Sequence, residues 1–194
     1  MTAPSGPQIQ PGDALVIVDV QADFLPGGAL AVPDGDAVVA PLNGWADCFD
    51  AARLPVFATR DWHPPDHCSF REQGGIWPPH CVAGSSGARF AEALKLPASA
   101  QIVSKATRRD EEAYSGFSGT DLDERLRRAS VQRLFVGGLA TDYCVLQTVT
   151  DALSLGYAVM LLTDAIRAVE VHPGDGAGAI AAMVAAGARQ VERA

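Results

Sequence analysis

RLFVGGLATDYCVLQT, at residues 133–148, passes from an apolar run through two glycines into a segment with helical spacing. The run at 134–136 predicts a buried strand, and Asp142 predicts the start of a helix. Cys144 therefore lies a few residues beyond the end of a strand, in the first turn of a helix. A strand that leads directly into a helix is typical of parallel sheets.

The same alternation of short aliphatic runs and helical spacing extends along the rest of the chain. ALVIVDV at 14–20 and YAVMLLTD at 157–164 are apolar at successive positions, as expected for strands that are covered on both faces. We predict strands at 14–19, 55–59, 101–104, 133–137, 158–163 and 190–192. The expected fold is α/β, with three layers (α/β/α) around a mainly parallel sheet of about six strands.

Three helices are predicted from the spacing of apolar residues. One is marked by apolar residues at steps of three and four between 38 and 49, where Pro41 indicates a late start or a bend. A second begins near Asp142 and ends before Gly156. A third occupies the alanine-rich stretch that ends at Gly187, a residue type common at helix C-termini.

Length and composition favour one domain over residues 1–194, in which 1–12 form a loose N-terminal extension. The formal net charge of −8 argues against a nucleic-acid partner, because phosphate binding needs clustered Lys and Arg. The first residues contain neither the basic nor the apolar region of a secretory signal, and no apolar stretch is long enough to span a bilayer. We therefore expect a soluble protein of the reducing cytoplasm, without membrane contact.

Cys144 is the first candidate for chemistry. At a helix N-terminus its thiolate would face unpaired N–H groups and the positive end of the helix dipole, which lowers the pKa of a thiol. The same N–H groups could hold the oxyanion that forms when a thiolate attacks a carbonyl. The alternative is a buried structural cysteine beneath the next helix.

A nucleophilic cysteine needs a base, and Asp19 ends the first predicted strand at the sheet edge where α/β proteins build their sites. Asp23 is better placed to support the loop that follows. Lys105 follows the strand at 101–104 at the corresponding edge, where it could keep a carboxylate ionised. Alone, Asp19 could equally be a turn former and Lys105 a solvated residue.

The segment 61–87 has neither strand nor helix spacing and is rich in Pro, Gly, His and Trp, which is typical of a functional insert. Asp61 and His63 are two residues apart, so in an extended segment they face the same way and could bind one metal ion. His80 could complete the set. One carboxylate with imidazoles suits a single divalent ion, Zn, Fe or Mn. The alternative is that these histidines only stabilise the loop.

His67 is a fourth candidate ligand, or it orients the loop through Asp66 and Ser69. Cys68 and Cys81 lie beside the histidines and suggest a Cys/His zinc site instead, although neither has CxxC-type spacing.

Several motifs together resemble the nicotinamidase (pyrazinamidase) branch of the isochorismatase-like cysteine hydrolases. In chain order they are VIVDVQADF with GGALAV, TRDWHPPDHCSF, WPPHCV, AYSGF and GLATDYCV. The match covers about residues 14 to 165, and DWHPPDH followed by WPPHCV is its most specific part. The resemblance implies the fold of that superfamily.

In that family an Asp–Lys–Cys triad performs the chemistry, and the matching residues are Asp19, Lys105 and Cys144. The resemblance also implies a cis peptide between Leu139 and Ala140, and an oxyanion hole formed by the N–H groups of Ala140 and Cys144.

The metal site of the family matches Asp61, His63 and His80, whereas His67 matches a position that ligates the metal in some members only. The aromatic walls of the substrate pocket match Phe24, Trp77 and Tyr114.

The implied activity is hydrolysis of nicotinamide to nicotinate and ammonia through a cysteine thioester, a step of NAD salvage, with pyrazinamide as a further substrate. The metal is expected to hold the pyridine nitrogen and orient the ring. The sequence leaves open whether the chain acts as a monomer or as a homo-oligomer.

Two alternatives remain. Another amidase of the superfamily, acting on a carbamoyl or other small amide, would keep Asp19, Lys105 and Cys144 but would not need the metal ligands. A non-catalytic zinc-binding module would instead use Cys68, Cys81 and the histidines, and its Cys144 would be unreactive.

Overall fold

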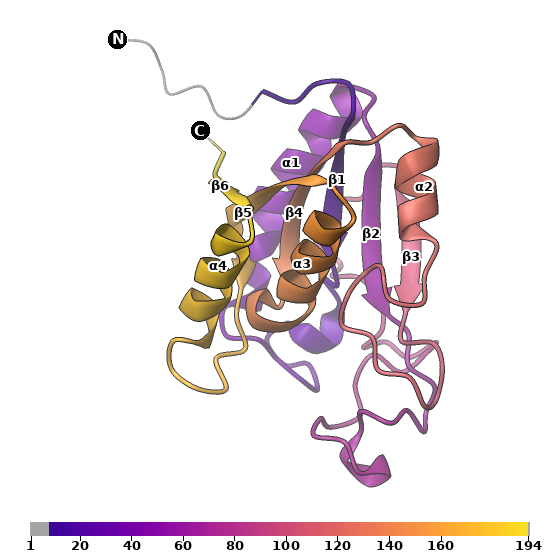
Figure 1. Cartoon of the computed structure of the whole chain (residues 1–194). Coiled ribbons are helices and arrows are strands. Elements are labelled where there is room, and N and C mark those ends of the chain that lie inside the picture. Colours follow the sequence, from indigo (N-terminus) through magenta and orange to yellow (C-terminus); the bar gives the residue numbers. More distant parts are fainter. Residues whose placement is uncertain (1–7, 194) are drawn as a thin grey trace.

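The computed structural model describes residues 8–193 and contains a six-stranded sheet in which each strand runs parallel to its neighbours (Figure 1). The strand order is β3-β2-β1-β4-β5-β6. The strands are β1 (Asp13–Val18), β2 (Val56–Asp61), β3 (Gln101–Lys105), β4 (Arg133–Leu139), β5 (Ala158–Arg167) and β6 (Arg189–Val191). The predicted α/β class and parallel sheet are confirmed, and β4 and β5 run further than predicted.

Helices cover both faces of the sheet and produce three layers (Figure 1). On one face lies α1 (Val39–Ala51); on the other lie α2 (Leu122–Arg128), α3 (Leu146–Ser154) and α4 (Asp175–Ala185). The chain steps from β1 to β2 in one direction and from β4 to β6 in the other, so right-handed crossovers place these helices on opposite faces. Within residues 8–193 no helix combines the length and apolar character that crossing a membrane requires.

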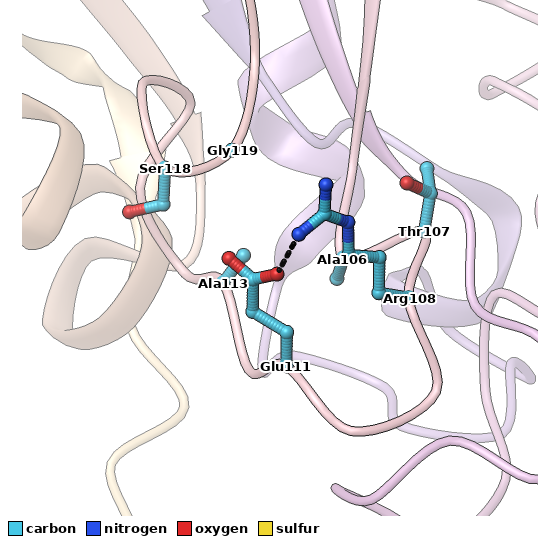
Figure 2. A pocket seen from close by; sticks show the side chains of 7 residues that line it. All are labelled: Ala106, Thr107, Arg108, Glu111, Ala113, Ser118 and Gly119. Atoms are coloured by element: carbon cyan, nitrogen blue, oxygen red, sulfur yellow. Dashed lines mark hydrogen bonds and ion pairs between the residues drawn. The ribbon is translucent and has the colours of Figure 1, made fainter.

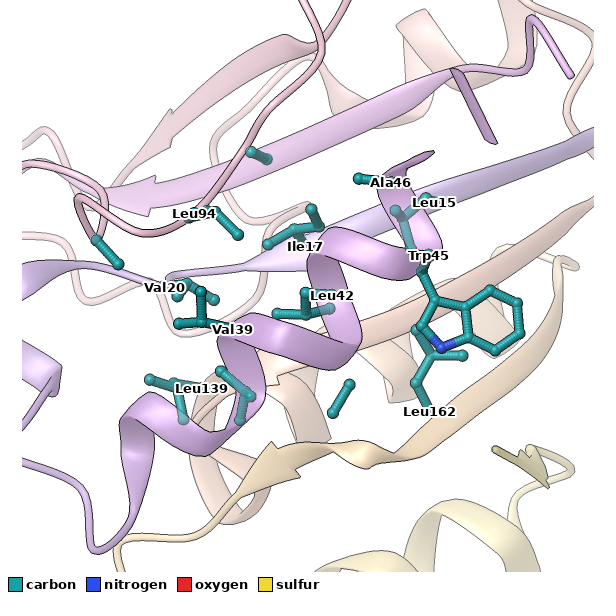
Figure 3. Packing of buried hydrophobic residues seen from close by; sticks show 14 of the residues in the cluster. Leu15, Ile17, Val20, Val39, Leu42, Trp45, Ala46, Leu94, Leu139 and Leu162 are labelled. Carbon is teal, nitrogen blue, oxygen red and sulfur yellow. The ribbon is translucent and has the colours of Figure 1, made fainter. Parts of the chain in front are cut away.

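The apolar residues that predicted α1, at steps of three and four, form the face that this helix buries against the sheet. Leu42 and Trp45 point from the helix toward Ile17 and its neighbours on the sheet (Figure 3). The Trp45 ring lies 5.4 Å from that of Phe135, centroid to centroid. Pro41 falls in the first turn of α1, where its missing N–H would have had no helical partner, so it neither breaks nor delays the helix.

α2 was not predicted, and its composition explains why. Only Leu122 and Leu126 are buried among its seven residues, too few to mark a period. Its arginines face acids one turn earlier, as in the pair between Arg127 Nε and Asp123 Oδ2 at 2.9 Å. The arginines at 125–128 therefore lie on the solvated surface of the helix.

Two long segments with little regular structure, 62–100 and 106–121, follow the carboxyl ends of β2 and β3. The irregular insert predicted for 61–87 lies in the first of them. In the second, Arg108 Nη1 donates a hydrogen bond to Glu111 Oε2 at 3.0 Å beside a shallow polar hollow (Figure 2). These two exposed side chains neutralise each other, so the hollow presents no unpaired charge.

Of the predicted extension 1–12, residues 1–7 lie outside the described residues. Residues 8–12 run beside the start of β4. The Gln8 carbonyl accepts a hydrogen bond from Arg133 Nη2 at 3.0 Å, and the Gly12 carbonyl accepts one from the Gln132 N–H at 2.8 Å. These bonds tie this stretch to the sheet.

Gly138 allows β4 to lie against β1 at the edge where the site is built. Its φ is +130°, and a β-carbon there would collide with the backbone of Val18. We expect Gly138→Ala to lower the free energy of unfolding by at least about 3 kcal/mol. Gly178→Ala in α4 is the matched control, because its β-carbon would meet nothing within 4 Å. That substitution should raise stability by about 0.5–1 kcal/mol. Urea unfolding measures both, and similar values for the two would contradict the steric argument.

Candidate active site

The candidate residues lie where neighbouring strands end. Asp19 follows β1 directly, Asp61 and Lys105 end β2 and β3, and β4 leads through Ala140 into a turn that carries Cys144. β1 lies between β2 and β4, so it is the point at which the strand order reverses. Ligands of open α/β sheets bind in the crevice at such a point. The topology therefore brings together residues that are far apart in the sequence.

Lys105 is the centre of this cluster. Its Nζ lies 2.9 Å from Asp19 Oδ2 and also contacts Asp61 Oδ1. It donates hydrogen bonds to the Ala113 carbonyl at 3.0 Å and to Cys144 Sγ at 3.5 Å. The ammonium group thus joins both carboxylates to the thiol in a fully buried environment.

The charges in the cluster shift one another's pKa values. Burial raises the pKa of Asp19, and the ammonium of Lys105 only partly opposes this. For Asp61 the balance is reversed: burial would raise its pKa, but Lys105 and His63 together lower it. Burial would lower the pKa of Lys105, but the two carboxylates raise it well above its ordinary value. Lys105 is therefore a permanent cation, and Asp19 is a stronger base than a free carboxylate.

The expected lowering of the Cys144 pKa is wrong. The residue does lie at the start of a helix, in one turn of π-helix, η4 (Thr141–Val145), that continues into α3. However, burial raises the pKa of its thiol well above the ordinary value; Lys105 opposes this shift and Asp19 adds to it. Cys144 is therefore a neutral thiol at rest and needs a base to become a nucleophile.

The backbone beside Cys144 forms a tight cradle. The peptide bond between Leu139 and Ala140 is cis, as the resemblance implied. The Ala140 carbonyl accepts hydrogen bonds from the N–H groups of Tyr143 and Val145 at 3.1 and 3.0 Å. Within residues 8–193 the Ala140 N–H has no hydrogen-bond acceptor. An unpaired donor next to the thiol is the arrangement that an oxyanion would require.

Asp61, His63 and His80 form a second cluster beside the first. Their potential ligand atoms lie within 4.8 Å of one another, and all three residues are buried. Neither ring nitrogen of His63 has a hydrogen-bond partner in the described part of the chain. His80 Nδ1 is bonded to the Pro78 carbonyl at 2.8 Å, which leaves Nε2 for another contact. Buried, unpaired imidazole nitrogens beside a carboxylate fit a divalent first-row ion.

His67 lies outside this ligand set. Its Nδ1 is 2.7 Å from Ser69 Oγ and its Nε2 is 3.1 Å from the Glu111 carbonyl, so both ring nitrogens are engaged. Its ring packs on that of His63, 4.2 Å away between centroids. Of the two neighbours expected to orient it, Ser69 does so, whereas Asp66 pairs with Arg109 instead. In this conformation His67 supports the loop.

The two other loop cysteines do not join a metal cluster among the described residues. Cys81 is buried, and burial raises the pKa of its thiol. Burial also raises the pKa of Cys68. Asp23 supports this loop, as expected, because its Oδ2 accepts the Cys81 N–H at 2.7 Å. The geometry therefore disfavours zinc bound by these thiols.

A pocket opens onto the cluster and is walled by aromatic side chains. Phe24, Trp77 and Tyr114 all line it, together with Asp61, His80, Ala140 and Cys144. Trp77 Nε1 donates a hydrogen bond to the Tyr114 hydroxyl at 2.9 Å, which joins the two long loops across the pocket. The three predicted aromatic residues therefore share one cavity with the thiol.

Sequence reasoning missed three further lining residues: Leu30, Tyr143 and Val169. Tyr143 precedes Cys144, and its ring packs edge-on against Trp77 at 5.1 Å. Its position next to Cys144, the candidate nucleophile, was a signal that could have identified it. Leu30 and Val169 come from loops, and nothing in their local sequence marks them.

Comparison with known proteins places this geometry in a family. A model of the isochorismatase domain matches residues 13–194. The chain belongs to the isochorismatase family. Within that family it is 42% identical to the nicotinamidase of Escherichia coli strain K12, over 92% of this chain and 93% of the relative.

Two solved structures are similar to this chain over nearly their whole length. The pyrazinamidase of Pyrococcus horikoshii, in complex with zinc, is 47% identical with a TM-score of 0.91, covering 94% of this chain and 100% of that one. PnC1 from L. infantum, in complex with nicotinate, is 35% identical with a TM-score of 0.85, covering 94% and 93%. The family and fold predicted from the motifs are thus confirmed.

Proposed function

We propose that this isochorismatase-family chain is a nicotinamidase, which hydrolyses nicotinamide to nicotinate and ammonia and also accepts pyrazinamide. The observation that carries the proposal is the pocket in which the Cys144 thiol, the Asp19–Lys105 pair and three aromatic walls meet beside a buried Asp/His cluster. The nicotinamidase and pyrazinamidase relatives support the choice of a pyridine or pyrazine carboxamide.

In the first step Asp19 takes the thiol proton of Cys144, and the sulfur attacks the carboxamide carbon. The carbonyl π-bond opens as the C–S bond forms, so that negative charge develops on the oxygen. The N–H groups of Ala140 and Cys144 would hold this oxyanion. Lys105 remains an ammonium ion and stabilises the charge that the cluster carries.

In the second step the tetrahedral intermediate collapses and the C–N bond breaks. Asp19 returns the proton to the departing nitrogen, which leaves as ammonia, and a thioester to Cys144 remains. Asp19 then takes a proton from a water molecule that attacks the thioester carbon, and nicotinate leaves as the Cys144 sulfur regains a proton.

Asp61, His63 and His80 would hold one divalent metal ion at the side of this pocket. When bound, the ion would supply a Lewis-acidic contact for the ring nitrogen, a positioning role rather than generation of the nucleophile. Zinc in the similar P. horikoshii pyrazinamidase supports a divalent ion here. Phe24, Trp77 and Tyr114 would enclose the ring, because flat apolar surfaces exclude water from it.

The test of this proposal is ammonia release from nicotinamide by the purified protein. We expect turnover together with about one divalent metal ion per chain, as three protein ligands at an open site imply. Removing the metal should raise KM more than it lowers kcat, because the ion positions the ring, and reloading should restore KM. An unchanged KM in fully demetallated protein would contradict that role.

The same preparation tests the alternative that this chain is another amidase of the family. Such an enzyme would need the Asp19, Lys105 and Cys144 cluster but no ring-binding metal. Turnover of small carbamoyl compounds, with no release of ammonia from nicotinamide by metal-loaded protein, would favour it. The observation against it is that the two buried ring nitrogens of His63 have no partner among residues 8–193, because a metal-free site would leave them unsatisfied.

A further inference from the structure

Thr59, a residue that the chemistry above does not use, contacts the proposed base. It lies on β2, is fully buried, and its Oγ1 donates a hydrogen bond to Asp19 Oδ1 at 2.6 Å. The two residues are also joined through the backbone, because the Asp19 N–H donates to the Thr59 carbonyl at 3.2 Å. One residue of β2 thus holds both the main chain and the carboxylate of Asp19.

The conformation of Asp19 makes this support necessary. Its φ is +48°, in the left-handed region that non-glycine residues rarely adopt, so the direction of its side chain is not set by an ordinary strand geometry. The residue lies just beyond β1, and the bond between its N–H and the Thr59 carbonyl links its backbone to β2. Lys105 contacts one oxygen of the carboxylate and Thr59 holds the other, so the two residues together keep it facing the cluster.

The orientation of Thr59 is itself fixed by packing. A β-carbon built at Gly116 would lie 2.9 Å from Thr59 Cγ2, so the methyl group fills the space that the glycine leaves. Gly116 is held in turn by its N–H, which donates to Thr148 Oγ1 at 2.9 Å. With its methyl group seated there, the Thr59 hydroxyl has one direction open to it, toward Asp19.

This arrangement gives the two oxygens of Asp19 different roles. Oδ1 is occupied by the Thr59 hydroxyl. Oδ2 lies 2.9 Å from Lys105 Nζ but outside hydrogen-bond geometry, and it has no hydrogen-bond partner in the described residues. Oδ2, on the Lys105 side of the carboxylate, is therefore the oxygen offered to the thiol proton. A partial rotation of the carboxylate would break the contacts of both oxygens at once.

We infer that Thr59 is a positioning residue for the proposed reaction: its hydroxyl fixes the carboxylate of Asp19 so that Oδ2 faces Lys105 and the Cys144 thiol. The inference rests on the proposed amidase function. Thr59 does not line the pocket, and within residues 8–193 its side-chain hydroxyl bonds to Asp19, so it acts through Asp19.

The test compares Thr59→Val, which keeps the shape but lacks the hydroxyl, with Thr59→Ser, which keeps the hydroxyl but lacks the seated methyl. In nicotinamide hydrolysis we expect Thr59→Val to lower kcat by about 10- to 100-fold with KM within about twofold. Thr59→Ser should recover most of kcat. Thr163→Val is the matched control, since it removes a hydrogen-bonded strand hydroxyl, at 2.9 Å from Glu192 Oε1, away from the pocket.

A second readout separates this inference from the proposed function. Alkylation of Cys144 by iodoacetamide needs the thiol proton to leave but needs no nicotinamide, so it should slow in Thr59→Val and recover in Thr59→Ser. If wild type releases no ammonia from nicotinamide, the proposed function fails and the alkylation rates alone decide the inference. The inference would be overturned by a wild-type alkylation rate in Thr59→Val, or by a Thr59→Ser variant that is alkylated as slowly as Thr59→Val. Thr59→Ala replaces Thr59→Val if the valine variant does not fold.

Discussion

Cys144→Ala is expected to abolish ammonia release from nicotinamide, with a fall in kcat of at least about 10⁴-fold. The pocket walls and the Asp/His cluster remain in this variant, so nicotinamide should still bind, with a Kd within about threefold of the wild-type KM, taken as an approximate binding constant. Steady-state ammonia release and calorimetric binding measure the two quantities. The separation of binding from turnover is what a nucleophile, as opposed to a structural cysteine, predicts.

Cys48→Ala is the control for this experiment, because Cys48 is an exposed thiol that does not line the pocket. It should retain wild-type turnover. Residual hydrolysis above about 1% of the wild-type rate in Cys144→Ala would rule out the thioester route, since an attacking water would then suffice. Loss of nicotinamide binding in Cys144→Ala would instead indicate that Cys144 has a structural role.

Lys105→Met should damage both stability and activity. Lys105 is 1% exposed and compensates two buried carboxylates, Asp19 and Asp61. Removing one partner of a buried ion pair leaves uncompensated charge, so we expect the free energy of unfolding to fall by about 3–5 kcal/mol. Turnover should fall by at least about 100-fold, because the cluster also loses its positive charge. Urea unfolding and ammonia release measure the two effects.

The double variant Lys105→Met/Asp19→Asn tests the cause of the instability. Removing one of the two facing carboxylates should recover part of the lost stability while turnover stays low, because the base is then absent as well. Lys95→Met is the matched control, since Lys95 is the other lysine of the chain and is exposed. Equal stability losses in Lys95→Met and Lys105→Met would contradict the charge argument.

The strands β1, β2, β4 and β5 could be predicted because each contains a short aliphatic run buried on both faces, and the parallel sheet followed from the intervening helical spacing. The helix α2 could not be predicted, because only Leu122 and Leu126 are buried and its other residues are charged. The carboxyl ends of parallel strands meet at one edge, and so Asp19, Lys105 and Cys144 were expected together. Their contacts place them together.

Local sequence was misleading for the thiol. A cysteine at a helix start suggests a lowered pKa, but the pKa of Cys144 depends on burial and on the carboxylates that β1 and β2 bring near it. Thr59 was missed for a similar reason. In the sequence Thr59 is an ordinary strand residue, and only the structure shows that its hydroxyl donates a hydrogen bond to Asp19.

The sequence by itself determined the layers, the edge at which the site lies, and, through its motifs, the family. Hydrophobic spacing and residue order are local properties, so they can be read along the chain. Only the tertiary structure decided which oxygen of Asp19 the Thr59 hydroxyl holds, which histidine nitrogens lack partners among the described residues, and the direction of the Cys144 pKa shift. These depend on distances and burial among groups from different strands and loops, and no stretch of sequence contains them.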